Sequence, residues 1–217
     1  MAADPHPTHR SDLLRILATH SFRLGDFTLA SGQRSDYYID CRITTLHAEG
    51  GRLSGLILYD LIRQHIPETV AVGGLTMGAD PLVSNIASAS AWAAIAGGDL
   101  PSSPQTNLQT RLLHGFLVRK SEKAHGTGRR IEGFLQPGAP VVIVDDVCTT
   151  GGSTILAIEA ARGAGMIVAG VLCLVDREQG GRAKIEAVAA PAPFLSVFTA
   201  DDIRASHRDL HTCGGDA

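Results

Sequence analysis

The sequence predicts an α/β protein with a central, mostly parallel sheet flanked by helices. Short runs of apolar residues alternate along the chain with longer segments whose apolar residues recur at helical spacing. Strands that are apolar on both faces are typical of parallel sheets covered by helices on both sides. With 217 residues, 44% of them hydrophobic, and no internal repeat, the chain is expected to form one domain with a sizeable core.

The first half of the chain is expected to hold three helices and three short strands. Ser11 is expected to cap the first helix, and Pro67 to limit the second, because proline cannot continue a helix. Asp80 and Pro81 are expected to begin the third helix as its N-cap and first-turn residue. The expected elements are a helix at 12–20, two strands around a Ser-Gly turn within 27–40, a helix at 48–65, a strand at 69–74, a loop at 74–81 and a helix at 81–98.

The second half continues this alternation after one linker-like stretch. Residues 97–110 are rich in Gly, Pro, Ser and Asn, and we interpret them as a surface excursion, because strands and helices resume beyond them. The expected elements are then strands at 112–120, 141–144, 167–176 and 194–198, with helices at 154–165, 181–189 and 200–207.

The composition argues against several classes of protein. Nineteen Lys and Arg against 22 Asp and Glu give a net charge of −3, which argues against a nucleic-acid binder or a membrane-surface protein. The four cysteines form no C-x-x-C pair, so neither a zinc ribbon nor a disulfide framework is expected, and a cytoplasmic location fits best. The N-terminus does not resemble a signal peptide, and the longest apolar run, 168–175, is too short to span a bilayer.

The most informative string is VVIVDDVCTTGGST, residues 141–154. A buried strand is expected to end at Asp145 and Asp146, and a glycine-bearing turn then leads into a helix. Ligands of open α/β sheets bind at the carboxyl ends of strands, where glycines and a helix N-terminus let backbone N–H groups approach a phosphate. The two carboxylates can accept hydrogen bonds from vicinal sugar hydroxyls or hold a metal ion. The string therefore predicts a site for a sugar phosphate.

A second informative segment is strongly basic. Arg119, Lys120, Lys123, Arg129 and Arg130 place five of the 19 basic residues within twelve positions, where an even spread would give about one. Charges this dense repel one another, and nearby glycines permit a hinge. We interpret the segment as a lid that a polyanion orders and that excludes water during reaction.

These strings, together with two others, resemble the orotate phosphoribosyltransferases. Residues 141–154 are similar to the phosphoribosyl-pyrophosphate (PRPP) signature of the type I phosphoribosyltransferases. The string VRKSEKAHGTGRRIEG, residues 118–133, resembles the mobile loop of the orotate branch, with its R-K-x-x-K-x-H-G order. FTLASGQRSDYYID at 27–40 is similar to that branch's N-terminal hood, and GGLTMGADP at 73–81 to its pyrophosphate loop.

The resemblance implies a fold and a reaction. The fold is the type I phosphoribosyltransferase fold, a single domain over residues 1–217 with a small hood at approximately 1–45 plus C-terminal elements, and a core at approximately 46–200. The reaction is transfer of the 5-phosphoribosyl group from PRPP to orotate in pyrimidine (UMP) biosynthesis, with Mg²⁺ held mainly through PRPP and no protein ligand assigned to it. The family's loop reaches into the neighbouring subunit's site, which implies a homodimer.

The resemblance also assigns roles to individual residues. Lys123 and His125 are the implied catalytic residues, because they neutralise the departing pyrophosphate. Orotate is implied to contact Arg177 through its carboxylate, Tyr38 and Ile39 through its ring, and Thr149. The implied PRPP-binding residues are Arg119, Lys120, Lys123, His125, Asp145, Asp146, Val147, Cys148, Thr149, Thr150, Gly151, Gly152 and Ser153.

The chain departs from the family pattern at two cationic positions. Better-known bacterial members carry a lysine where this chain has Ala30 in the hood, and another where it has Met77 in the pyrophosphate loop. Both lysines would stabilise a leaving anion. Arg34 is the hood residue that could supply part of the missing charge, although its planar fork differs from a lysine.

Three alternatives stay open from the sequence. The first is a purine-type phosphoribosyltransferase, which the hood string and Arg177 disfavour. The second is a non-catalytic PRPP-sensing regulator, which the intact loop with Lys123 and His125 disfavours. The third is a C-terminal metal site at His207, His211 and Cys213, for which a frayed amphipathic tail is the simpler explanation.

Overall fold

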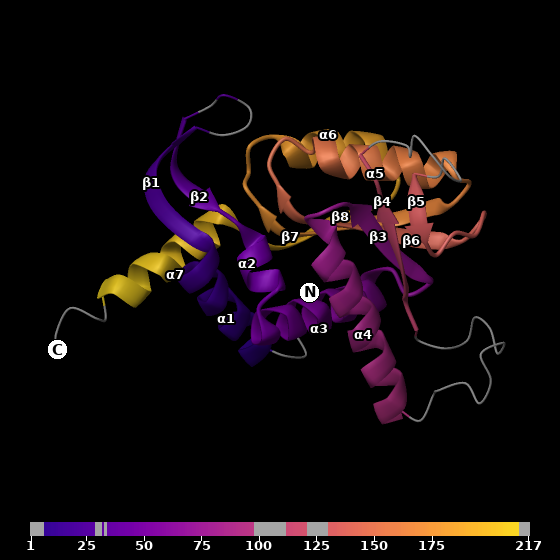
Figure 1. Ribbon diagram of the computed structural model, residues 1–217, viewed down its shortest axis with the longest axis horizontal. Helices are drawn as coiled ribbons and strands as arrows, with labels where there is room; N and C mark the ends of the chain where they lie inside the picture. The colour runs from indigo at the N-terminus through magenta and orange to yellow at the C-terminus, as the bar shows by residue number, and fades with distance from the viewer. Residues whose placement is uncertain (1–6, 29–31, 33, 98–111, 121–129, 213–217) are drawn as a thin grey trace.

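The computed structural model describes residues 7–28, 32, 34–97, 112–120 and 130–212. At its centre is a six-stranded sheet in the order β5-β4-β3-β6-β7-β8 (Figure 1). Neighbouring strands run parallel except β4 and β5, which are antiparallel. The predicted mostly parallel sheet is therefore confirmed. Its strands are β3 (Ala71–Leu75), β4 (His114–Val118), β5 (Ile131–Gly133), β6 (Pro140–Cys148), β7 (Ile167–Asp176) and β8 (Phe194–Thr199).

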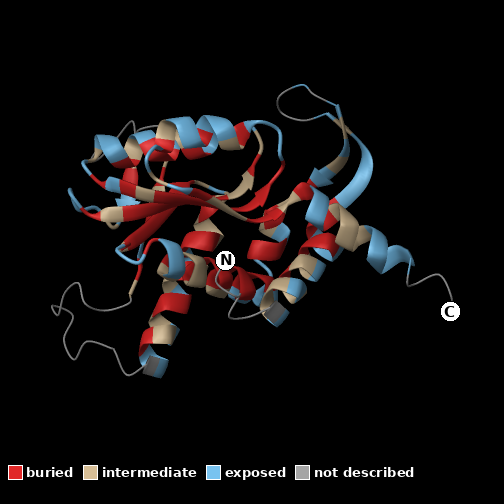
Figure 2. Cartoon of the chain, turned by 180° about the vertical axis from the view of Figure 1, so that it is seen from behind, coloured by how far each residue is buried: buried red, intermediate tan, exposed pale blue. Residues whose placement is uncertain are grey.

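Helices cover both faces of this sheet, as the apolar strands predict. α3 (Ala48–His65) and α4 (Ala79–Gly97) lie on one face, and α5 (Gly152–Gly163) and α6 (Gly181–Ala189) lie on the other (Figure 1). Each face has its own apolar core. Figure 2 shows the buried positions gathered on the strands and on the inward faces of the helices. No helix in the described part of the chain is long and apolar enough to cross a membrane.

A separate two-stranded hairpin stands beside the sheet. Its strands, β1 and β2, are antiparallel, and the terminal helix α7 lies next to it (Figure 1). Arg204 of α7 forms an ion pair with Asp36 of the hairpin. The C-terminal helix therefore packs against N-terminal structure. The elements of this region are α1 (Pro7–Ile16), a π-helical turn (Leu17–Ser21), β1 (Phe22–Thr28), β2 (Arg34–Ile39), α2 (Cys41–Thr45) and α7 (Ala200–Thr212).

Several predicted boundaries are wrong, each for a local reason. Ser11 does not cap α1, which already begins at Pro7, and its hydroxyl donates to the Thr8 carbonyl oxygen at 2.9 Å. Asp80 lies inside the first turn of α4, because that helix begins at Ala79. The π-helical turn and α2 were not expected. The 97–110 stretch lies, apart from its first residue, outside the described residues.

The strand order creates a switch point between β3 and β6. β3 pairs with β4 on one side and with β6 on the other, so the connections that follow these two strands diverge. In open α/β sheets, such a divergence leaves a crevice at the carboxyl ends of the two strands. The carboxyl end of β6 is longer than predicted, since the strand continues past Asp145 and Asp146 to Cys148 through pairing with β7.

Candidate functional site

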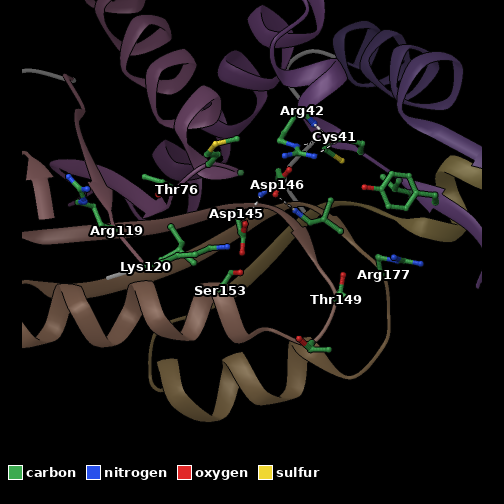
Figure 3. A pocket seen from close by; sticks show the side chains of 18 of the residues that line it. Cys41, Arg42, Thr76, Arg119, Lys120, Asp145, Asp146, Thr149, Ser153 and Arg177 are labelled. Carbon is green, nitrogen blue, oxygen red and sulfur yellow. Dashed lines mark hydrogen bonds and ion pairs between the residues drawn. The ribbon is translucent and has the colours of Figure 1, made fainter. Parts of the chain in front are cut away.

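A cavity of about 1030 Å³ opens at the carboxyl ends of β3 and β6. The hairpin, α2 and the loops after both strands contribute to its walls (Figure 3). Most of the residues predicted to form the site line this one cavity. They are Tyr38, Ile39, Arg119, Lys120, Asp145, Asp146, Val147, Thr149, Thr150, Ser153 and Arg177.

The other predicted residues have different locations. The Cys148 side chain is fully buried among apolar residues, and burial raises the pKa of its thiol to about 12. Gly151 is the N-cap of α5 and Gly152 its first residue, and neither is among the described residues that line the cavity. Lys123 and His125 lie outside the described residues.

Asp145, which is buried, and Asp146, which is half-buried, form an acid pair that lines the cavity. The Thr154 hydroxyl donates to Asp145 Oδ2 at 2.7 Å, and the Asp146 amide donates to Asp145 Oδ1 at 3.1 Å. Burial raises the pKa of Asp145 to about 7; the neighbouring charge of Asp146 adds to this, and the Thr154 bond opposes it. The pair can therefore accept hydrogen bonds, and burial favours the protonated form of Asp145 over a wider pH range than is usual for an aspartate.

The turn from β6 into α5 has the geometry of an anion site. Gly151 is the N-cap of α5 with φ +81°, a conformation that favours glycine. A Cβ there would lie 3.0 Å from the Gly181 carbonyl oxygen, so α6 packs closely behind the turn. The free N–H groups at the start of α5 and the hydroxyls of Thr149, Thr150 and Ser153 can donate to a phosphate.

The loop after β3 packs against the acid pair. A Cβ at Gly78 would lie 2.4 Å from Asp146 Oδ1, so only glycine allows this approach. The Thr76 amide donates to the Val118 carbonyl oxygen at 2.9 Å, which joins the loop to the end of β4. Met77, where the family pattern has a lysine, is 65% exposed.

Cationic side chains lie on both sides of the acid pair. In Figure 3, Arg119 and Lys120 lie on one side of Asp145 and Asp146, and Arg177 lies on the other. The cavity can therefore bind one anionic group near Arg119 and Lys120 and a second near Arg177.

Arg42 is a cavity cation that the sequence did not identify. It lies in the first turn of α2, above Asp146 (Figure 3). Asp40 caps α2 and holds Arg42 by two hydrogen bonds, to Nε at 2.9 Å and to Nη2 at 2.8 Å. The Arg42 charge opposes the rise that burial causes in the pKa of Asp146. The available signal was Asp40, the last residue of the expected strand segment 27–40, because aspartate is a common N-cap.

Arg34, the proposed substitute for the missing lysines, does not line the cavity. Its guanidinium forms an ion pair with Asp26 on the outside of the hairpin, where both side chains are mostly exposed. Ala30 lies outside the described residues. In this structure the charge of Arg34 is therefore directed away from the site.

The C-terminal histidines pack against structure nearby. The rings of His207 and His211 lie 4.2 Å apart, and His207 Nδ1 is 3.0 Å from the Ala18 carbonyl oxygen. Cys213 lies outside the described residues. Among the residues described, no three His, Cys, Asp or Glu side chains gather in a way that could hold a metal ion.

Comparison with known proteins gives consistent relatives. The chain is 41% identical over 201 residues to the orotate phosphoribosyltransferase of Synechocystis sp., covering 92% of this chain and 90% of that protein. It is 39% identical over 185 residues to that of Rhodopirellula baltica, covering 83% and 88%. The crystal structure of the Mycobacterium tuberculosis orotate phosphoribosyltransferase in complex with PRPP matches with a TM-score of 0.68 and 31% identity, over 90% of this chain and 99% of that one. No protein-family model matches the chain.

Proposed function

This chain belongs to the orotate phosphoribosyltransferase family, and from that premise we propose that it transfers the 5-phosphoribosyl group of PRPP to orotate, giving orotidine 5'-monophosphate and pyrophosphate in pyrimidine (UMP) biosynthesis. The observation that carries the proposal is the cavity itself. It combines an acid pair, an anion-binding turn and cations on both sides of the pair. The sugar substrate carries a phosphate and a diphosphate, and the base that attacks it carries a carboxylate. Binding all three anionic groups and the sugar hydroxyls requires this set of groups.

PRPP is expected to lie along the carboxyl end of β6. Asp145 and Asp146 accept hydrogen bonds from the ribose hydroxyls, and the turn at 149–153 holds the 5-phosphate through N–H and hydroxyl donors. The acid pair lies at the end of β6 and the turn follows it directly in the chain, which supports this placement. The diphosphate then extends toward Arg119 and Lys120.

The reaction is a displacement at the anomeric carbon. The bond to pyrophosphate breaks as positive charge develops on the ribose ring, and a ring nitrogen of orotate attacks from the opposite face. Arg119 and Lys120, with Lys123 and His125 of the basic loop, stabilise the leaving group, while Arg177 holds orotate on the other side. The protein's contribution is positioning, exclusion of water and charge stabilisation.

Mg²⁺ is the expected cofactor, held mainly through PRPP. Asp145 and Asp146 supply carboxylate oxygens beside the expected diphosphate, and oxygen is the ligand type that Mg²⁺ prefers. Mg²⁺ commonly keeps several waters and binds one or two carboxylates together with substrate phosphates, which this cavity can accommodate. When bound, it neutralises charge that develops on the leaving pyrophosphate.

The assembly and location of the protein are also proposals. We expect a homodimer in which the basic loop of each subunit reaches into the partner's cavity, no nucleic-acid partner, and a cytoplasmic location. A single domain over residues 1–217 fits the packing of α7 on the hairpin through Arg204 and Asp36. Analytical ultracentrifugation tests the dimer.

The reaction is tested by a spectrophotometric assay of orotate consumption with PRPP and Mg²⁺, run beside adenine, hypoxanthine and uracil. We expect orotate to be consumed and the other bases to be left unchanged. Consumption of a purine without orotate would support the purine-type alternative. Binding of PRPP without turnover of any base would support the sensor.

A further inference from the structure

Arg177 is a buried cation whose described partners are all neutral. Arg177 is the residue directly after β7, and it is only 6% exposed. Nε donates to the Tyr37 hydroxyl at 3.4 Å, and Nη2 donates to Ser35 Oγ at 3.2 Å. The neighbouring carboxylate of Asp176 is taken by Arg182 at 3.0 Å. A buried charge without a counter-charge is costly, so Arg177 favours an anion in the cavity that it lines.

The Ser35 hydroxyl can act only as an acceptor toward Arg177. Its proton is used, because Ser35 Oγ donates to the Tyr37 carbonyl oxygen at 2.7 Å. Its lone pairs then face the Arg177 guanidinium and, at 3.4 Å, the Tyr37 amide. The conformation of β2 therefore presents a fixed acceptor to Arg177.

Two arginines share the ring of Tyr37, and among the described residues a carboxylate pairs with only one of them. The guanidinium carbon of Arg177 lies 4.6 Å from the ring centre, and that of Arg204 lies 4.8 Å from it. Asp36 neutralises Arg204 through two hydrogen bonds of 2.7 and 3.0 Å. Stacking on an aromatic face orients a guanidinium plane. The arginine without a described counter-charge is the one that lines the cavity.

We infer that Ser35 and Tyr37 are positioning residues that hold the Arg177 guanidinium for the carboxylate of orotate. They use two of its five N–H donors and leave three, enough for the paired hydrogen bonds that a carboxylate accepts from an arginine. The inference rests on the proposed function and deepens it. It assigns part of the recognition of the base to hairpin residues that act through Arg177.

The test is the steady-state kinetics of Ser35→Ala and Tyr37→Phe, with the KM of each substrate measured separately. Each variant is expected to raise the KM for orotate by about three- to tenfold, the scale of a weak hydrogen bond to a charged group. The KM for PRPP and kcat are expected to stay within about twofold. Ser196→Ala is the matched control, since it removes a similar 2.9 Å serine bond to Arg182, which is not a cavity residue.

A double-mutant cycle with Arg177→Ala separates positioning from folding. In the Arg177→Ala background, Ser35→Ala is expected to raise the KM for orotate no further, because its effect acts through Arg177. An additive effect, or equal increases in both KM values, would overturn the inference and leave the proposed function standing. If Arg177→Ala itself leaves the KM for orotate unchanged, the role of Arg177 in the proposed function is wrong, and the inference is overturned with it.

Discussion

The two walls of the cavity are built in opposite ways. The phosphate wall, residues 145–153, is a contiguous piece of chain in which a strand runs directly into a turn and a helix. The hood wall is assembled from separate segments, because β2, the end of β7 and α7 meet around Tyr37. The phosphate wall is shaped by backbone, whereas the hood wall is shaped by long polar and aromatic side chains.

This difference implies different responses to mutation. The loop after β3 packs tightly against the phosphate wall, because a Cβ at Gly78 would lie 2.4 Å from Asp146 Oδ1, so a single methyl group can displace a carboxylate of that wall. A wall made of stacked and ion-paired side chains distributes its energy over several contacts, so each loss is small. A single substitution against the phosphate wall should therefore cause a large loss of activity, and a single substitution in the hood wall a small one.

The largest effect is expected at Lys123 of the basic segment 119–130. Lys123→Ala is expected to lower kcat by roughly 100- to 1000-fold, the scale of losing one preorganised donor to a leaving anion. A discontinuous assay at saturating substrate concentrations measures kcat. The exposed Lys184 of α6 gives the matched control, and Lys184→Ala should turn over normally. Normal turnover in Lys123→Ala would remove that residue from the mechanism.

Gly78→Ala tests how abruptly the phosphate wall fails. The new Cβ would meet Asp146 Oδ1 at 2.4 Å and force Asp146 or the loop to move. A displacement of about 1 Å at a reacting centre can cost about 100-fold, so kcat/KM for PRPP is expected to fall by that order. Gly163→Ala is the control, since a Cβ there meets nothing within 4 Å. A loss below about threefold for Gly78→Ala would contradict an inflexible wall.

The same contrast explains what could be predicted from the sequence. Strand 167–176 and helix 181–189 were predicted with their observed bounds. The phosphate wall was predicted as a ligand site from the continuous string of residues 141–154. Their determinants are local, namely apolar runs, glycines and a helix start. Ser11 failed as a cap because an upstream proline already begins the helix.

The hood wall was predicted only in part, because its determinants are not local. Arg177 was identified through a family resemblance, but its partners Ser35 and Tyr37 are 142 and 140 residues away. Arg42 was missed because α2 was not expected, and only α2 brings it above Asp146. Arg34 was favoured on charge alone, and its pairing with Asp26 depends on the hairpin register.

Two arginines near the hood sharpen the comparison, since each is paired with an aspartate and only Arg42 lines the cavity. Arg42→Ala is expected to raise the KM for PRPP about tenfold through loss of one charge beside Asp146. Arg34→Ala is expected to change it less than about twofold, because its ion pair is exposed. Initial-rate measurements at varied PRPP distinguish the two. A similar increase in the KM for PRPP in both variants would mean that Arg34 also contributes to PRPP binding.

The smallest effect concerns the hydrogen bond from Thr154 to Asp145, and it depends on pH. The pKa of Asp145 is raised to about 7 in the folded chain, above its ordinary value of 3.8. Its protonation therefore contributes stability that is fully present below about pH 4 and is lost as the pH rises through 7. The Thr154 hydroxyl opposes this loss, because it donates to the ionised carboxylate at 2.7 Å.

Thr154→Val should therefore destabilise the fold more at pH 8 than at pH 5, by about 1 kcal/mol, the difference between a charge-assisted and a neutral hydrogen bond. Urea denaturation at the two pH values measures the free energy of unfolding, and Thr154→Ser, which keeps the hydroxyl, is the control. Equal destabilisation at both pH values would mean that Asp145 does not change its charge in this range. Asp145 would then carry the same charge at both pH values. The phosphate wall would differ from the hood wall only in being built from contiguous backbone.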